Sequence, residues 1–443
     1  MIGQFPWDPF PQNVPLPKGP DPIHAHAFQS AVTSADAYRG VREALRVEHD
    51  LLRIGNRFVG LRRYREIAFV ALGVAAGSMA LAADRVLGDY LTAGFVAGPL
   101  PALGEVPFQR IEIALGAPIA PRAEEVVRST LEIAETLSDD QLLLLLLSPG
   151  ALSALALPPA GMSAEEFSDL LSRARSQGAN AREVERIARV LGGGGVGGAL
   201  GAAVGSADVA TLLVDRGDGA RLAGGGPVHP VLVGERTEVR SLLARLGLLN
   251  VLPASARERL APDPSSASMD AAPVHRPVYV SQPSDALVGA GDALFDRKWR
   301  VRLGMLELRG SPEDAAEQFI TRVEEVLARE PPPAADKSQG IAVPAMTTLD
   351  QPEGEDDGPA QARFLEHAER RQRRREISIG LFRTAGSIGP SGYPAGAAIG
   401  RPSNTEYSWK PGRARAIPME AGVTDVGFLA LALLPAVPPE PSK

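Results

Sequence analysis

The chain has no cysteine among its 443 residues. Disulfides, thiolate catalysis and cysteine-ligated zinc or iron–sulfur sites are therefore excluded. Histidine is also scarce: there are six, and only His24 and His26 are close together. Residues spaced i, i+2 share one face of a strand but not of a helix, so a metal role for this pair is not favoured.

Aromatic residues make up only 5% of the chain, and basic residues do not predominate. The core must therefore consist mainly of Ala, Leu and Val, which favours an α/β fold. The 46 Lys and Arg against 53 Asp and Glu give a net charge of −7. We expect no general nucleic-acid binding, because that requires a basic surface.

Long apolar runs are missing too. The longest, residues 67–83, is interrupted by Gly73, Gly77 and Ser78, and falls short of the roughly 20 residues of a membrane span. The first 22 residues show no basic region followed by an apolar one, so we expect no signal peptide. Their prolines forbid a helix. These features predict a cytoplasmic protein without membrane contact, preceded by a proline-rich arm over residues 1–27.

Apolar runs and helix signals alternate along the rest of the chain, which predicts βαβ units and a parallel sheet. We also expect a helix over residues 35–54, because apolar residues follow helical spacing up to Gly55. The predicted fold class is α/β, with a Rossmann-like parallel-sheet domain over residues 28–272 and a smaller α/β domain over residues 273–443. Strands of the first domain are expected at 67–72, 91–97, 111–115, 142–147 and 209–214.

Candidate site residues follow the expected strands. A strand and a helix start join within residues 65–78, and Val74 stands where a phosphate-using enzyme would carry a cation. Asp215 and Asp218 follow the strand at 209–214. Ligands of open α/β sheets bind at the carboxyl ends of strands, so these carboxylates are candidates. A turn role for Asp215 and a flexible loop for the glycine run 192–198 are the alternatives.

Six segments, in the same order, resemble the two-domain glycerate 2-kinases. The C-terminal half of that family is often called the MOFRL domain, and its members have also been labelled hydroxypyruvate reductases. The resemblance extends from about Phe28 to Pro435. The segments are residues 69–88, 145–167, 176–191, 211–230, 384–399 and 423–435.

This resemblance implies ATP-dependent phosphorylation of D-glycerate to 2-phosphoglycerate in a cleft between two domains. ATP and Mg²⁺ would be the cofactors, glycerate and the nucleotide the small-molecule partners, and a homodimer is left open. The implied catalytic and Mg²⁺-binding residues are Asp215 and Asp218. The implied substrate- or nucleotide-binding residues are Gly73, Ser148, Gly150, Gly226, Pro227, Thr384 and Gly386.

The chain departs from the family at charged positions. Two lysines, an arginine and two aspartates of the family correspond here to Val74, Gly195, Pro359, Ala385 and Ile388. Phosphoryl transfer depends on neutralising phosphate charge, so two alternatives to an active kinase stay open: an impaired pseudo-enzyme, or an altered or misread sequence. A hydroxypyruvate reductase using NAD(P) is less favoured, since residues 73–77 lack the second glycine of the dinucleotide fingerprint.

Overall fold

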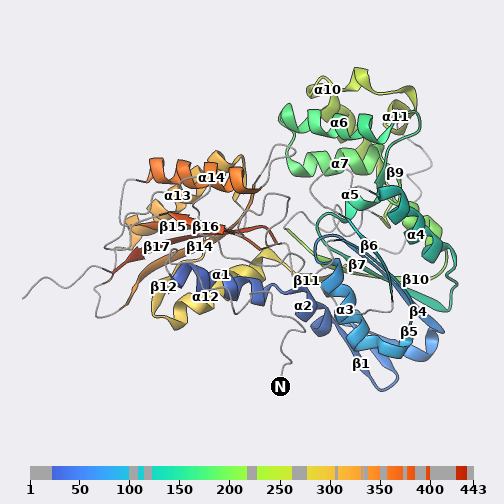
Figure 1. Cartoon of the computed structure of the whole chain (residues 1–443), viewed down its shortest axis with the longest axis horizontal. Coiled ribbons are helices and arrows are strands. Elements are labelled where there is room, and N and C mark those ends of the chain that lie inside the picture. The colour runs from blue at the N-terminus through green and yellow to red at the C-terminus, as the bar shows by residue number, and fades with distance from the viewer. Residues whose placement is uncertain are drawn as a thin grey trace, which may run out of the picture. The chain divides into compact units, whose positions relative to one another are not determined.

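The computed structural model describes twelve stretches of the chain and forms two compact units. We call them the parallel-sheet unit, residues 37–281, and the mixed-sheet unit, residues 22–36 and 282–436 (Figure 1). The described residues are 22–98, 108–113, 122–216, 227–261, 277–304, 308–330, 333, 338–349, 357–372, 377–384, 396–399 and 426–436.

These units divide the chain differently from the predicted boundaries at residues 28 and 273. Helix α1 (Pro22–Ser34) belongs to the mixed-sheet unit, because it packs along α12 (Pro283–Asp296). Strand β11 (Val278–Ser281) belongs to the parallel-sheet unit, because it pairs with β10 (Asp208–Val214). The tertiary contacts at each junction therefore decide the division.

The parallel-sheet unit contains a six-stranded sheet in the order β11-β10-β7-β4-β5-β6. Its neighbouring strands are all parallel. The chain starts at β4, builds outward to β6, returns to β7 and builds to β11, so the order reverses between β4 and β7. This is the doubly wound Rossmann arrangement, and it confirms the predicted fold class. The remaining strands are β4 (Glu66–Leu72), β5 (Leu91–Gly98), β6 (Gln109–Glu112) and β7 (Gln141–Leu147).

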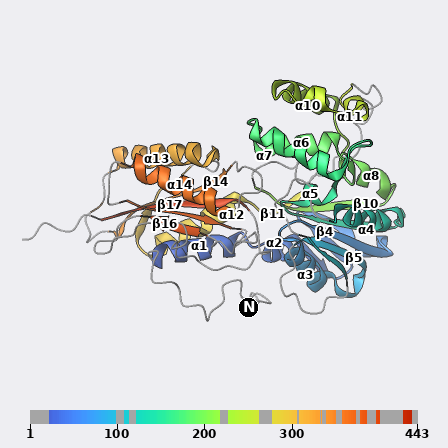
Figure 2. The same cartoon turned by 45° about the horizontal axis from the view of Figure 1, so that its top comes forward.

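Helices on both faces bury this sheet, which explains its continuous apolar strands. Every residue of β7 is buried. Alternate residues of β4, Ala68, Val70 and Leu72, join one core cluster with residues of α4 (Ala123–Glu135). Helix α3 (Ala76–Leu87) covers the other face (Figure 2).

Further helices of this unit lie beyond the sheet. Capping boxes at Ser163 and Asn180 start α6 (Ala164–Ser176) and α7 (Ala181–Leu191). Both views show α6, α7, α10 and α11 gathered together. The other helices are α5 (Ala151–Leu155), α8 (Ala199–Val204), α10 (Val233–Arg245) and α11 (Ala254–Arg259).

The predicted helix over residues 35–54 is wrong. Helix α2 (Ala37–Ala44) ends early, and β1 (Leu45–Glu48), β2 (Leu51–Ile54) and β3 (Arg57–Gly60) form an antiparallel meander. His49 (φ 57°) and Gly55 (φ 60°) make the turns. Leu52 and Ile54 are both buried, so burial follows the two-residue period of a strand. The sparse apolar residues of this segment also fitted helical spacing.

The mixed-sheet unit contains a sheet in the order β12-β14-β17-β15-β16, with β13 paired to β14. Helices α13 and α14 cover one face, while α1 and α12 cover the other (Figures 1 and 2). No helix among the described residues is long and apolar enough to cross a membrane. The elements are β12 (Trp299–Val301), β13 (Leu308–Gly310), α13 (Pro312–Arg329), β14 (Gly340–Leu349), α14 (Asp357–Arg371), β15 (Ser378–Arg383), β16 (Gly396–Ile399) and β17 (Phe428–Pro435).

Candidate functional site

The parallel sheet brings three of the predicted site residues to one edge. Leu72 of β4 pairs with Leu147 of β7, so Gly73 and Ser148 follow level positions on either side of the point where the strand order reverses. Leu147 also pairs with Leu213 of β10, and Asp215 directly follows that strand. Gly73, Ser148 and Asp215 therefore lie at the carboxyl ends of three neighbouring strands, where ligands bind in this fold.

The chain's own groups close the turn between β4 and α3. The hydroxyl of Ser148 is buried, accepts a hydrogen bond from the amide of Ala75 at 3.0 Å and donates one to the carbonyl of Leu72 at 3.0 Å. The amide of Val74 donates to the carbonyl of Pro149 at 2.9 Å. The first amides of a helix are a common phosphate site. Here the amides of Val74 and Ala75, which precede α3, already have acceptors, so these two do not bind a phosphate.

Gly73 permits this close approach of two turns. Its φ is +104°, and a Cβ placed there would lie 2.3 Å from the carbonyl oxygen of Ser148. A side chain would therefore force the strand ends apart. Gly150 (φ 92°) also adopts a left-handed conformation, and it starts α5. Gly73 and Gly150 thus shape the edge of the sheet through their backbone conformations.

At the position of the family lysine, Val74 is an apolar side chain that is only 2% exposed. An ammonium group at this depth would need a paired anion to offset its lost hydration. The packing around Val74 therefore agrees with the loss of a cation from this turn.

Asp215 is the predicted carboxylate that the structure describes. It is 6% exposed, and its amide donates to the carbonyl of Ser281 at the end of β11, at 2.9 Å. No cluster of three or more His, Asp or Glu able to hold a metal occurs in the described part of the chain. Mg²⁺ is often held by one or two carboxylates together with waters and substrate phosphates. A single buried aspartate at this edge fits such a role.

The glycine run is ordered by pairing and packing, so the flexible-loop interpretation does not hold. Strand β9 (Gly193–Gly194) pairs with β8 (Ala156–Leu157). The amide of Gly195 donates to the carbonyl of Leu155, and a Cβ at Gly195 would lie 2.8 Å from a methyl carbon of Leu155. The position of the second family lysine has no room for a side chain without movement of that leucine.

Pro227 closes against the helix that follows this run. Its carbonyl accepts from the amides of Leu200 and Gly201, at 3.2 and 3.4 Å. Pro227 thus bonds to the first turn of α8. Asp218 and Gly226 lie outside the described residues.

Thr384 lies in the mixed-sheet unit and is fully buried. Its hydroxyl donates to the carbonyl of Gly427 at 2.7 Å and accepts from the amide of Val426 at 3.0 Å. The side chain therefore ties the end of β15 to the start of β17. Gly386, Ala385 and Ile388 lie outside the described residues, and Pro359 is described only as part of the α14 backbone.

The histidine pair lies in a helix, not in a strand. His24 and His26 both belong to α1. His24 is fully buried, its Nε2 lies 2.9 Å from the hydroxyl of Ser378, and burial lowers its pKa to about 3. His26 is half-buried. Residues spaced i, i+2 in a helix do not share a face.

Comparisons with known proteins identify the family. A family model described as "Domain of unknown function (DUF4147)" matches residues 24–261, more than half of the chain. The chain belongs to this family. Among curated relatives of this DUF4147 protein, glycerate kinase from Danio rerio is 29% identical over 251 residues, covering 53% of this chain and 49% of the relative. Glycerate kinase from Bos taurus is 28% identical over 255 residues, covering 53% and 47%.

The chain spans about half the length of these curated relatives. Among solved structures, a glycerate kinase from Thermotoga maritima matches with a TM-score of 0.64 at 18% identity, over 93% of this chain and 99% of that one. A protein from Pyrococcus horikoshii OT3 matches with a TM-score of 0.62, also at 18% identity, over 94% and 98%. Such identities show the fold. Together with the curated relatives, they confirm the predicted resemblance to the glycerate kinase family.

Proposed function

We propose that this DUF4147 protein transfers the γ-phosphoryl group of ATP to the 2-hydroxyl of D-glycerate, giving 2-phosphoglycerate and ADP. The observation that carries the proposal is Asp215, a buried carboxylate at the carboxyl edge of a doubly wound sheet. Ligands of such sheets bind at this edge, beside the strand-order reversal. The glycerate kinases of Danio rerio and Bos taurus support the choice of substrate.

The proposed roles follow from where the described residues lie and, for Asp218 and Gly226, from the family resemblance. Asp215 holds Mg²⁺ through its carboxylate, and Asp218 is the second candidate ligand. Bound Mg²⁺ would neutralise charge on the transferring phosphate. Gly73, Ser148 and Gly150 shape the edge, and Gly226 and Pro227 approach the nucleotide phosphates.

Thr384 and Gly386 are proposed, from the family resemblance, as further substrate- or nucleotide-binding residues. In the reaction the 2-hydroxyl oxygen bonds to the γ-phosphorus, the bond from that phosphorus to the β–γ bridging oxygen breaks, ADP leaves with the bridging oxygen, and the hydroxyl proton passes to solvent. With Val74 in place of a lysine, no cation from this turn assists the step, so we expect slow turnover.

An aspartate exchange on strand β10 tests the proposal. We expect Asp215→Asn to lower kcat for ADP release by about 100-fold or more, because the neutral amide is a far weaker Mg²⁺ ligand. The assay contains D-glycerate, ATP and Mg²⁺, and phosphorus NMR identifies the product. Asp208→Asn, at the opposite end of the same strand, is the matched control and keeps wild-type turnover. Equal activity in Asp215→Asn and wild type would refute the assignment.

A pseudo-enzyme is the second candidate, and the buried Val74 together with the closed turn before α3 favours it. A chain of this kind keeps the fold and binds ligand without phosphoryl transfer. The same assay separates the two, provided that circular dichroism confirms folded protein. Absence of ADP release, together with a rise in melting temperature on adding D-glycerate, supports the pseudo-enzyme.

A further inference from the structure

A buried arginine in α7 holds a short segment of backbone. Arg189 has a side chain only 2% exposed, and its Nη1 lies 2.6 Å from both carboxylate oxygens of Glu235 in α10. Its Nη2 donates to the carbonyls of His229 and Pro230, at 3.0 and 3.2 Å. One guanidinium group therefore joins two helices and two consecutive carbonyls.

Glu235 binds the same segment from the other side. Its carboxylate accepts from the amide of Leu232 at 2.9 Å, as well as from Arg189. Between them, Arg189 and Glu235 bond three backbone groups of residues 229–232. This segment follows Pro227, and hence the stretch that begins at Asp215 in the proposed site.

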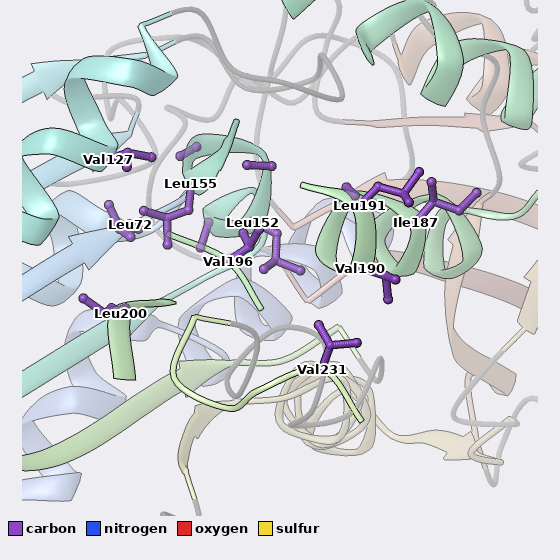
Figure 3. Close-up of a cluster of buried hydrophobic side chains, with 14 of the residues drawn as sticks. Leu72, Val127, Leu152, Leu155, Ile187, Val190, Leu191, Val196, Leu200 and Val231 are labelled. Atoms are coloured by element: carbon purple, nitrogen blue, oxygen red, sulfur yellow. The ribbon is translucent and has the colours of Figure 1, made fainter. Parts of the chain in front are cut away.

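Glycines on the facing side let the backbones come close. A Cβ at Gly198 would lie 2.7 Å from Cα of Pro230, and one at Gly201 would lie 2.2 Å from the carbonyl oxygen of Val228. Figure 3 shows Val190 of α7 and Val231 pointing toward one another within the core cluster. Residues 227–232 are therefore enclosed between α7 and the end of the glycine run.

A second, more exposed ion pair joins the same two helices. Arg186 and Glu238 also link α7 to α10, at 2.6 Å, with side chains 34% and 60% exposed. Burying a charge costs more than burying an apolar residue of similar size unless the charge finds several partners. Arg189 finds them in the carbonyls of residues 229 and 230.

We infer that Arg189, held by Glu235, is a positioning residue that fixes residues 227–232 and thereby holds Pro227 in place at the proposed site. The inference deepens the proposed function, since Gly226 and Pro227 are proposed to approach the nucleotide phosphates. Its first consequence does not depend on that function: loss of Arg189 should free Pro227 from the amides of Leu200 and Gly201.

Hydrogen exchange measured by mass spectrometry on peptides spanning residues 199–203 tests this consequence. We expect exchange at least tenfold faster in Arg189→Met and in Arg189→Lys, at urea concentrations far below global unfolding. Lysine keeps a charge for Glu235 but cannot reproduce the fork of bonds to two carbonyls. Arg186→Met, on the same helix, is the matched control and exchanges at the wild-type rate. Wild-type exchange in Arg189→Lys would overturn the inference.

Steady-state kinetics supply a readout that simple destabilisation does not move. We expect the KM for MgATP to rise at least tenfold in Arg189→Lys, while the KM for D-glycerate changes less than twofold. A loss of folded molecules alone would lower the apparent kcat at unchanged KM. An unchanged KM for MgATP would overturn the positioning role. If the wild type shows no turnover, the proposed function fails, and the exchange comparison alone decides the inference.

Discussion

At the scale of single residues, internal bonds limit what the carboxyl edge of the parallel sheet can bind. The amide of Ala75 donates to the Ser148 hydroxyl, and the amide of Val74 donates to the Pro149 carbonyl. The two amides that precede α3, at the strand-order reversal, are therefore not free for a phosphate group. Asp215 is the predicted charged residue that the structure does place at this edge.

A buried histidine should make the mixed-sheet unit sensitive to acid. The pKa of His24 is about 3 in the folded protein, because burial disfavours the charged ring, and about 6.5 in an unfolded chain. Its contribution to stability is thus complete above pH 6.5 and is lost as the pH falls from there towards 3. Between pH 7 and pH 5, we expect a loss of about 2 kcal/mol in the free energy of unfolding.

Urea unfolding at these two pH values, followed by Trp299 emission, measures this loss. His24→Leu should reduce the difference between the two pH values by most of that amount. His26→Gln, on the same helix but half-buried, is the control and should leave the difference nearly unchanged. An equal loss in wild type and His24→Leu would show that other groups cause the acid sensitivity.

At the scale of elements, close backbone contacts decide how the glycine-rich segment packs. Gly201 of α8 and Gly234 of α10 both lie in the first turn of a helix, where alanine is normally preferred. A Cβ at Gly201 would meet the Val228 carbonyl oxygen at 2.2 Å, whereas one at Gly234 would meet no atom within 4 Å. The two sites therefore differ in packing but not in helix preference.

Alanine exchanges at these glycines should change stability in opposite directions. We expect Gly201→Ala to lower the free energy of unfolding by about 1–3 kcal/mol through overpacking. Gly234→Ala should raise it by about 0.5 kcal/mol, because alanine loses less backbone entropy on folding. Urea unfolding followed by circular dichroism measures both. Two changes of the same sign would contradict the contact at Gly201.

Helix and strand periods explain which elements could be predicted. Continuous apolar runs as short as those of β4, β7 and β10 predict buried parallel strands. Residues 35–54 also fit a helix, because their apolar residues are sparse enough to match both the helical period and the strand period. Pairing among β1, β2 and β3 decided between them, and that pairing depends on two turns with positive φ.

At the scale of the whole molecule, each unit has a hydrophobic core of its own. One core cluster combines residues of the parallel sheet with residues of α4 to α8, α10 and α11, and another combines residues of α13, α14 and the mixed sheet. The chain's tryptophans, Trp7, Trp299 and Trp409, all lie outside residues 37–281. Trp299, the tryptophan within the described residues, is buried in the mixed-sheet unit, so its emission reports on unfolding of that unit.

We expect equilibrium unfolding in urea to depart from two-state behaviour. The midpoint of Trp299 emission should differ from that of far-ultraviolet circular dichroism, because the latter also reports on the parallel-sheet unit. Lowering the pH from 7 to 5 should move the emission midpoint further than the dichroism midpoint, since His24 belongs to the mixed-sheet unit. Coincident midpoints at both pH values would show that the two units unfold as one.

The sequence alone determined the α/β class, the parallel strands and the resemblance to glycerate kinases, because local periodicity and segment order carry that information. Tertiary structure decided the role of each site residue. Whether Ser148 faces a ligand or bonds to Ala75 depends on the register between β4 and β7. The bond between Arg189 and Glu235 joins residues 46 apart in the chain, so no local pattern could predict it. The physical reason is packing, because a buried charge bonds to groups on the elements that the fold places beside it.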